Sequence, residues 1–135
     1  MRSPRLRVYV HLVWATHERR PLLTSTLEPL VHESLRQRCG FGGTTLLALG
    51  GVEDHVHLLI ALPATLSLAQ LVGDLKGWSS YQANHQTERP LPFRWQGAYA
   101  ALSVSERGVE PVIRYIARQR EHHRHHPGGP WELDA

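Results

Sequence analysis

Two histidines in a short apolar segment are the residues of this chain best suited to chemistry. Residues 54–60 read DHVHLLI, a run typical of a buried strand, and His55 and His57 stand two positions apart within it. Side chains two apart on a strand leave the same face of the sheet. Two imidazoles on one face can bind one divalent cation, but two ligands rarely hold a metal alone. A site at this pair therefore needs a third ligand from elsewhere in the chain.

A segment near the C-terminus offers further candidates at helical spacing. Tyr115 and Gln119 are four positions apart, so on a helix they are neighbours on one face. A tyrosine in an amphipathic helix is more often a core residue, and a glutamine more often a solvated one. Their combination with the histidine pair joins a possible nucleophile to a possible amide ligand. Alternative ligands occur in the segment HHRHH, which a solvated helix end would also explain: His122, His123, His125 and His126.

Other known uses of paired histidines do not fit the sequence. Histidine-triad nucleotide hydrolases need a third histidine at the position of Leu59. Paired-histidine phosphoesterases need a second His-x-Ser/Thr motif on another strand, and no predicted strand carries one. A Gly-x-x-x-x-Gly-Lys loop for nucleoside triphosphates is also missing, so no nucleotide cofactor is expected.

The segments around these residues predict alternating strands and helices. Apolar and β-branched runs predict strands at residues 7–15, 44–49, 55–62 and 95–105, with a tight connection at residues 50–54. Helical spacing predicts helices at residues 26–39 and 68–86, the second with Ser67 as its N-cap. A last helix begins near Gly108, has Pro111 in its first turn and carries Tyr115. This order, β-α-β-β-α-β plus a C-terminal helix, predicts an α+β, ferredoxin-like fold with helices on one face of an antiparallel sheet.

Composition indicates one soluble domain over residues 1–135. The hydrophobic content of 41% and charged content of 20% are those of a globular protein. No apolar run has the length of a membrane span, and the N-terminus lacks a signal-peptide pattern. The single Cys39 excludes an intramolecular disulfide and a Cys-x-x-Cys zinc site. We therefore expect a cytoplasmic protein without a membrane partner.

The charge is compatible with a nucleic-acid partner. The net charge is +3, and 14 of the 15 basic residues are arginine. Arginine suits phosphate because its planar fork donates two hydrogen bonds at once, but a GC-rich genome enriches arginine equally well. Each basic side chain alone is more often a solvated charge. The candidates for phosphate contacts are Lys76, Arg94, Arg114 and Arg118. Three aromatic residues could stack on unpaired bases, although core packing suits at least two of them better: Trp78, Trp95 and Tyr99.

The order and spacing of these segments resemble those of a known family. HVH on a strand, KGWSSYQ, WQGAYAALSVS and the YIARQREHH helix are similar to the single-tyrosine HUH transposases of bacterial insertion sequences (the 200/605 class, TnpA type). REP-associated tyrosine transposases are close relatives of these enzymes. The opening VYVHLVWATHERRPLL also looks like the family's first strand and turn. The resemblance covers residues 7–126, and its specificity lies in the joint order of motifs that are individually weak.

The resemblance implies a concrete activity. Such enzymes bind single-stranded DNA with hairpins, cut one strand and join its 5′ phosphate to tyrosine. By resemblance, Tyr115 is the nucleophile, while His55, His57 and Gln119 bind Mg²⁺ or Mn²⁺. The chemistry agrees, because a Lewis acid activates a phosphodiester and a tyrosyl phosphodiester conserves bond energy for rejoining. Asp54 is expected to be a turn residue or a hydrogen-bonding partner of a ligand.

The family also implies a homodimer, in which two-fold symmetry requires a self-complementary surface. We expect the first and third strands to supply that edge, and VSERGVE to be the hinge of the tyrosine helix. Two other functions remain open. One is a hairpin-DNA-binding protein that does not cleave, and the other is a metal-binding module that uses the histidine-rich tail.

Overall fold

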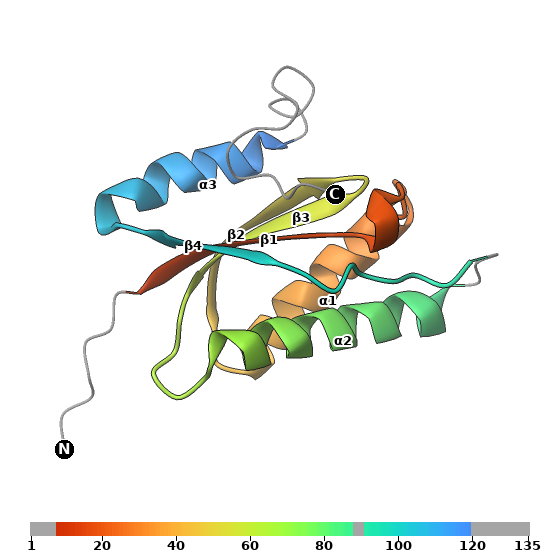
Figure 1. Cartoon of the computed structure of the whole chain (residues 1–135), viewed down its shortest axis with the longest axis horizontal. Helices are drawn as coiled ribbons and strands as arrows, with labels where there is room; N and C mark the ends of the chain where they lie inside the picture. Colours follow the sequence, from red (N-terminus) through yellow and green to blue (C-terminus); the bar gives the residue numbers. More distant parts are fainter. Residues whose placement is uncertain (1–7, 88–90, 120–135) are drawn as a thin grey trace.

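The computed structural model describes residues 8–87 and 91–119, which form one antiparallel sheet covered on both faces (Figure 1). The strands are β1 (Tyr9–Ala15), β2 (Thr45–Val52), β3 (His55–Ala61) and β4 (Ala100–Val104), in the order β2-β3-β1-β4. The helices are α1 (Leu27–Phe41), α2 (Leu68–Gln86) and α3 (Val109–Ala117), with short 3-10 turns at His17–Arg19 and Glu106–Gly108. The predicted α+β, ferredoxin-like order with an additional C-terminal helix is confirmed. None of the described helices is long and apolar enough to cross a membrane.

The two faces of the sheet carry different side chains. Helices α1 and α2 lie on one face and α3 on the other (Figure 1). Leu12, Trp14 and Leu58 belong to the large apolar cluster shared with α1 and α2. Leu59 belongs to a smaller cluster beneath α3, with Ile116 of that helix. Because β1 and β3 are inner strands covered on both faces, their sequences are almost continuously apolar, which makes the histidines in them conspicuous.

Helix α2 follows its sequence signals closely. It spans the predicted residues 68–86, and the Ser67 side chain accepts a hydrogen bond from the Gln70 backbone N–H at 3.1 Å. Pro111 lies in the first turn of α3, where the missing N–H leaves no helical hydrogen bond unmade. Helix α1 runs two residues past its predicted end, to Phe41.

The predicted connection at residues 50–54 is wrong in extent. Strand β2 continues to Val52, with Gly50 paired to His57 and Gly51 to Val56. The glycines extend the ladder to the turn of the β2–β3 hairpin. Gly50 is also required for the packing of α3. A Cβ at this position would lie 2.4 Å from the Ile116 carbonyl oxygen of α3. The absence of a side chain there lets α3 approach the sheet closely.

The predicted strand at residues 95–105 is too long. Only Ala100–Val104 forms β4, and Trp95 makes an isolated bridge to Thr16. Between them, the carbonyl oxygens of Gln96 and Ala98 accept hydrogen bonds from Lys76 Nζ at 2.7 and 3.0 Å. This segment is therefore tied to α2 through a side chain instead of continuing the ladder.

The strand order also corrects the expected dimer edge. Both β1 and β3 are inner strands, since β1 lies between β3 and β4 and β3 lies between β1 and β2. Their backbone groups pair within the sheet, so neither strand can offer an edge to a second subunit. The outer strands of the described sheet are β2 and β4.

Candidate functional site

His55 and His57 lie side by side on β3, on the face covered by α3. Both side chains are fully buried, and their ring centroids are 5.0 Å apart. Across β1 they pair with Ala15 and Val13, whose small side chains leave room for two imidazoles. The two-residue spacing in the sequence thus places both rings on one face, as predicted.

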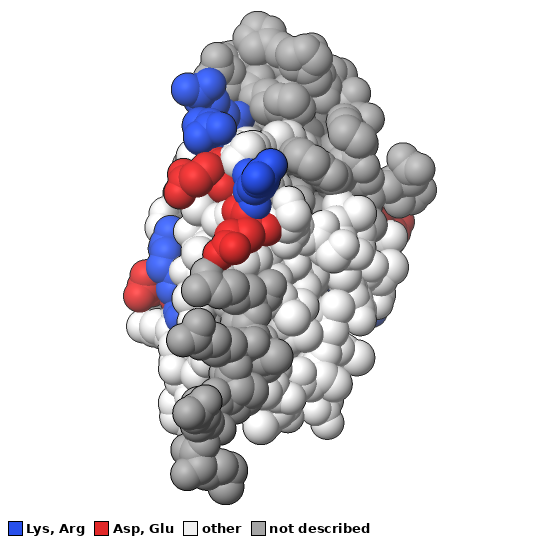
Figure 2. Space-filling view, turned by 90° about the vertical axis from the view of Figure 1, so that its left-hand side faces the viewer, with Lys and Arg blue, Asp and Glu red and all other residues white. Residues whose placement is uncertain are grey.

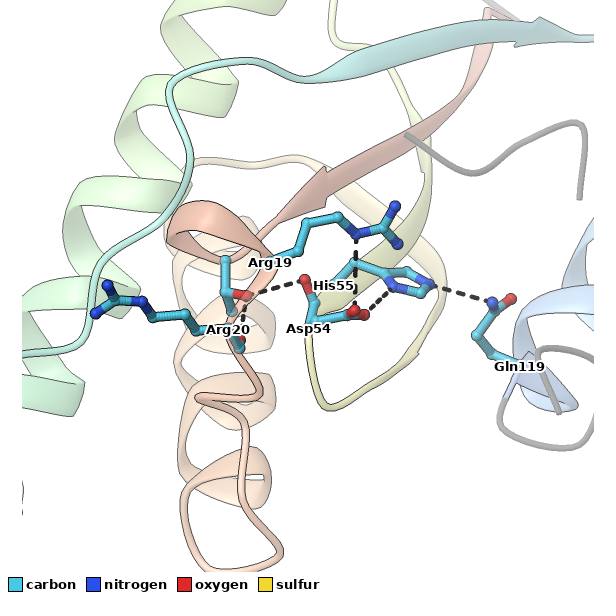
Figure 3. A network of polar contacts seen from close by, with 6 residues as sticks. Arg19, Arg20, Asp54, His55 and Gln119 are labelled. Atoms are coloured by element: carbon cyan, nitrogen blue, oxygen red, sulfur yellow. Dashed lines mark hydrogen bonds and ion pairs between the residues drawn. The ribbon is translucent and has the colours of Figure 1, made fainter. Parts of the chain in front are cut away.

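Asp54 fixes the orientation of His55. Its Oδ1 atom lies 2.7 Å from His55 Nδ1, and its Oδ2 atom lies 3.6 Å from Arg19 Nε (Figure 3). A carboxylate only accepts hydrogen bonds, so in the neutral imidazole the proton lies on His55 Nδ1 and His55 Nε2 has the lone pair. Asp54 is therefore a hydrogen-bonding partner of His55, which is one of the two roles that the sequence suggested. Arg19, the second contact of Asp54, adopts the left-handed backbone conformation, with φ of 52°.

His57 makes an equivalent contact with a residue that sequence reasoning missed. His57 Nδ1 lies 2.9 Å from Nε2 of His11, which is 1% exposed on β1. The available signal was a single histidine inside the apolar run YVHLVWA. It could not be used alone, because only the pairing of β1 with β3 brings His11 diagonally beside His57.

Helix α3 brings Tyr115 and Gln119 to the histidine pair. The Tyr115 ring lies edge-on to His57, with centroids 5.5 Å apart, and is half-buried. Gln119, two residues past the end of α3, is 1% exposed, and its Nε2 atom lies 3.3 Å from His55 Nε2 (Figure 3). The four-residue spacing thus directs both side chains to one place, within a single chain.

The residues present suit a small divalent cation. Two ligand atoms at 2.0–2.1 Å from an octahedral Mg²⁺ lie about 3 Å apart, close to the separation of His55 Nε2 and the Gln119 amide. Rotating that amide by half a turn would place its oxygen toward His55. Within residues 8–87 and 91–119, no group of three His, Cys, Asp or Glu side chains could hold a metal ion. A cation here would therefore need Gln119 with His55 and His57, and substrate or water oxygens. The alternative tail histidines lie outside the described residues.

Of the predicted phosphate contacts, the three arginines are exposed, whereas the lysine is held by backbone groups. Arg114 and Arg118 are exposed on α3 and its C-terminal cap, next to Tyr115. Arg94 is exposed beside the Thr16–Trp95 bridge, and its carbonyl oxygen accepts from the His17 backbone N–H at 2.9 Å. Lys76 lies on α2, across the sheet, where two carbonyl oxygens hold its ammonium group. Burial lowers the pKa of Lys76.

In the view of Figure 2, acidic and basic side chains are interspersed and do not form one large basic area.

The three aromatic candidates for base stacking differ in their surroundings. Trp95 is a packing residue, since it contacts Phe93 and Trp14 edge-on and donates to Ser79 Oγ at 2.9 Å. Trp78 stacks on Tyr81 in the helical layer. Tyr99 is 36% exposed and remains the candidate for stacking on a base.

A comparison with family models decides the identity of the chain. The model described as "Transposase IS200 like" matches residues 5–119. The chain belongs to the IS200-like transposase family. The predicted resemblance is confirmed, and the chain is accordingly a DNA-binding transposase of the insertion-sequence class.

Individual IS200-like transposases show the same relationship. The ISDra2 transposase TnpA of Deinococcus radiodurans is 27% identical over 116 residues, 82% of this chain and 83% of that protein. The transposase of insertion sequence IS200 from Salmonella typhimurium is 30% identical over 76 residues, 56% of this chain and 50% of that protein.

Solved structures match the fold along most of the chain. A structure described as a transposase from Deinococcus radiodurans R1 has a TM-score of 0.69 and 28% identity, covering 88% of this chain and 98% of that one. A REP-associated tyrosine transposase bound to a REP hairpin has a TM-score of 0.68 at 13% identity, covering 91% of this chain and 72% of that one. The second likeness concerns the fold alone.

Proposed function

We propose that this IS200-like transposase cuts and rejoins single-stranded DNA through a 5′-phosphotyrosine on Tyr115, with Mg²⁺ or Mn²⁺ at His55, His57 and Gln119. The observation that carries the proposal is the convergence of a half-buried tyrosine, two fully buried imidazoles and one buried amide under α3. The Tyr115 ring is 5.5 Å from the His57 ring, and the Gln119 amide is 3.3 Å from His55 Nε2. A phenol can act as the nucleophile, and three neutral ligands, one of them with a carboxylate partner, can hold the cation that assists phosphoryl transfer.

In the proposed reaction, Tyr115 Oη forms a bond to phosphorus while the bond from phosphorus to the 3′ oxygen breaks. The phenol loses its proton, and the leaving 3′ oxygen gains one to become a hydroxyl. A bound divalent cation would polarise the phosphate oxygens. The side chains of this chain have separate tasks: His55 and His57 present lone pairs, and Asp54 keeps the His55 lone pair directed toward the site. Rejoining reverses the exchange and needs no nucleotide.

The proposed DNA is single-stranded and carries hairpins. A structural relative is bound to a REP hairpin, which supports this class of substrate. Arg114 and Arg118 are placed to contact phosphates beside Tyr115, and Arg94 could extend the path at the end of β1. We assign Lys76 a structural role instead, because two carbonyl oxygens already accept its hydrogen bonds. The transposase is expected to act in the cytoplasm, where the DNA is.

The proposal includes a homodimer formed through an outer strand. Strand β2 is the better candidate, because it has eight residues against five in β4 and carries half-buried leucines at positions 46, 47 and 49. The segment before α3 could still act as a hinge: Ser105 Oγ and its carbonyl oxygen both accept from the Gly108 N–H. Light scattering at micromolar concentration measures the oligomeric state, and a monodisperse monomer would contradict this part.

The test of the proposal is a denaturing gel of labelled single-stranded DNA carrying a hairpin, incubated with Mg²⁺ or Mn²⁺. The wild type should give a protein–DNA adduct that EDTA prevents. Tyr115→Phe should bind DNA without forming the adduct, since it removes one oxygen and keeps the ring. His57→Ala should also give none. Tyr81→Phe, an exposed tyrosine on α2, is the matched control and should leave the adduct unchanged.

Four outcomes would contradict the proposal. An adduct in Tyr115→Phe would move the nucleophile to another tyrosine, and an adduct in EDTA would remove the role of the histidine pair. DNA binding without any adduct in the wild type would favour the hairpin-binding protein. The metal-binding module of the tail predicts instead that deleting residues 122–135 abolishes cation binding while His55→Ala does not.

A further inference from the structure

We infer that His11 is a positioning residue, which fixes the tautomer of His57 and so the direction of its lone pair. The inference deepens the proposed function and rests on it for the role of the cation. His11 Nε2 lies 2.9 Å from His57 Nδ1 in a buried contact that the proposed reaction does not use, and the two side chains are 1% and 0% exposed.

The two histidines of β3 need the same kind of support. A neutral imidazole has one N–H and one lone pair, and the hydrogen bond at one nitrogen decides which nitrogen can bind a cation. At His55, Asp54 occupies Nδ1 and leaves Nε2 directed toward Gln119. At His57, His11 occupies Nδ1, so His57 has only Nε2 left for a cation.

The direction of the His11–His57 hydrogen bond follows from this requirement. If His57 Nδ1–H donates to His11 Nε2, then His57 Nε2 has the lone pair that a ligand needs. The opposite assignment places the proton on His57 Nε2 and removes that lone pair. The proposal therefore requires that His11 be the acceptor, with its own proton on Nδ1. His11 also lines a mostly apolar cavity of about 250 Å³, to which Ser103 and Ser105 contribute.

The fold holds the His11 ring firmly in this position. His11 lies on an inner strand and pairs with Leu59 of β3 on one side and with Leu102 of β4 on the other. Its ring also lies edge-on to Tyr115, with centroids 6.1 Å apart. Because two neighbouring strands and one helix fix the His11 ring, it can hold His57 in one orientation. A mobile surface residue could not do so.

The first test observes the tautomer directly in the metal-free protein. Long-range ¹H–¹⁵N correlation spectra distinguish the protonated nitrogen of each neutral histidine ring. We expect His57 to carry its proton on Nδ1 in the wild type and to populate the Nε2–H form in His11→Leu. An Nε2–H wild type, or an unchanged tautomer in His11→Leu, would overturn the inference.

The second test measures Mn²⁺ binding by calorimetry or by the EPR signal of the free ion. His11→Leu should weaken binding by about 10- to 100-fold, the usual effect of losing a partner of a metal ligand. His11→Gln should stay within a few-fold of wild type, because its amide oxygen reaches the place of Nε2. His11→Asn, one methylene shorter, should bind as weakly as His11→Leu. The two amide variants keep a polar residue at this site, so they decide the question if the leucine variant does not fold.

The control is His32→Leu, which makes the same substitution at a buried histidine of α1 and should leave Mn²⁺ affinity unchanged. Equal affinities for His11→Gln and His11→Asn would show that His11 acts by packing alone, and would refute the hydrogen-bonding role. Failure of the proposed function gives a different result: a wild type that binds no Mn²⁺. In that case the tautomer spectra alone decide whether His11 positions His57.

Discussion

Replacing Gly50 with alanine should disable the site while leaving the fold intact. The new Cβ would lie 2.4 Å from the Ile116 carbonyl oxygen and 3.0 Å from its Cγ2, where ordinary contacts begin at 3.4 Å. Strand β2 is held by its ladder to β3, so the C-terminal turn of α3 must move by about 1 Å. Ile116 follows Tyr115 directly, and Gln119 lies three residues further on. The displacement therefore reaches both residues that α3 brings to the histidines.

The magnitude follows from the geometry of such sites. A displacement of about 1 Å can lower the rate by about 100-fold, whereas overpacking costs typically 1–3 kcal/mol of stability. The assay is the single-turnover rate of adduct formation with hairpin DNA, next to a thermal melt of each variant. Gly73→Ala on α2 is the matched control, because a Cβ there meets nothing within 4 Å. That variant should keep the wild-type rate and gain up to about 1 kcal/mol of helix stability. A wild-type rate in folded Gly50→Ala would refute the role of the close approach.

The other predictions concern the partner of His55, the buried thiol and the basic side chains. Asp54→Asn should weaken Mn²⁺ binding by about 10- to 100-fold in a calorimetric titration, because an amide fixes the His55 tautomer less firmly than a carboxylate does. Burial raises the pKa of the Cys39 thiol to about 11, so alkylation at pH 8 should be roughly two hundred-fold slower than that of the unfolded chain, measured by mass spectrometry. The folded-state pKa lies above the unfolded one near 8.5, so this thiol's contribution to stability is complete below pH 8.5 and declines as pH rises toward 11. Arg114→Gln and Arg118→Gln should each reduce the salt dependence of single-stranded DNA binding by about 0.7 in slope, while Lys76→Gln should lower thermal stability and leave that slope unchanged.

Local signals in the sequence predicted much of the fold. The N-cap at Ser67 and the leucine spacing after it defined α2, because both act within a few residues. The sequence did not show that Gly50 lies within β2. A glycine is needed there because of the approach of α3, about 60 residues later in the chain. The end of β4 likewise depends on Lys76, a residue of another element. Strand order is equally non-local, and the expected dimer edge failed for that reason.

The residues of the candidate site also differ in whether a local sequence pattern could predict them. Spacing alone placed His55 with His57 on one face and Tyr115 with Gln119 on another, and the family resemblance joined the two pairs. His11 required the register between β1 and β3, which no local pattern contains. The orientation of His55 by Asp54 was left open by the sequence, because a residue at the start of a strand can turn its side chain either way.

The two faces of this sheet are covered by apolar clusters of different size, so the two helical layers should not open together. Among residues 8–87 and 91–119, sixteen buried apolar residues form the cluster between the sheet, α1 and α2, whereas three, supported by partly buried neighbours, form the cluster beneath α3. Local opening costs less free energy where it exposes less buried apolar surface to water. The α3 layer should therefore separate from the sheet more readily than the sheet separates from α1 and α2. Since His55 and His57 are fully enclosed, such a partial opening would let a DNA strand enter without unfolding the scaffold that holds them.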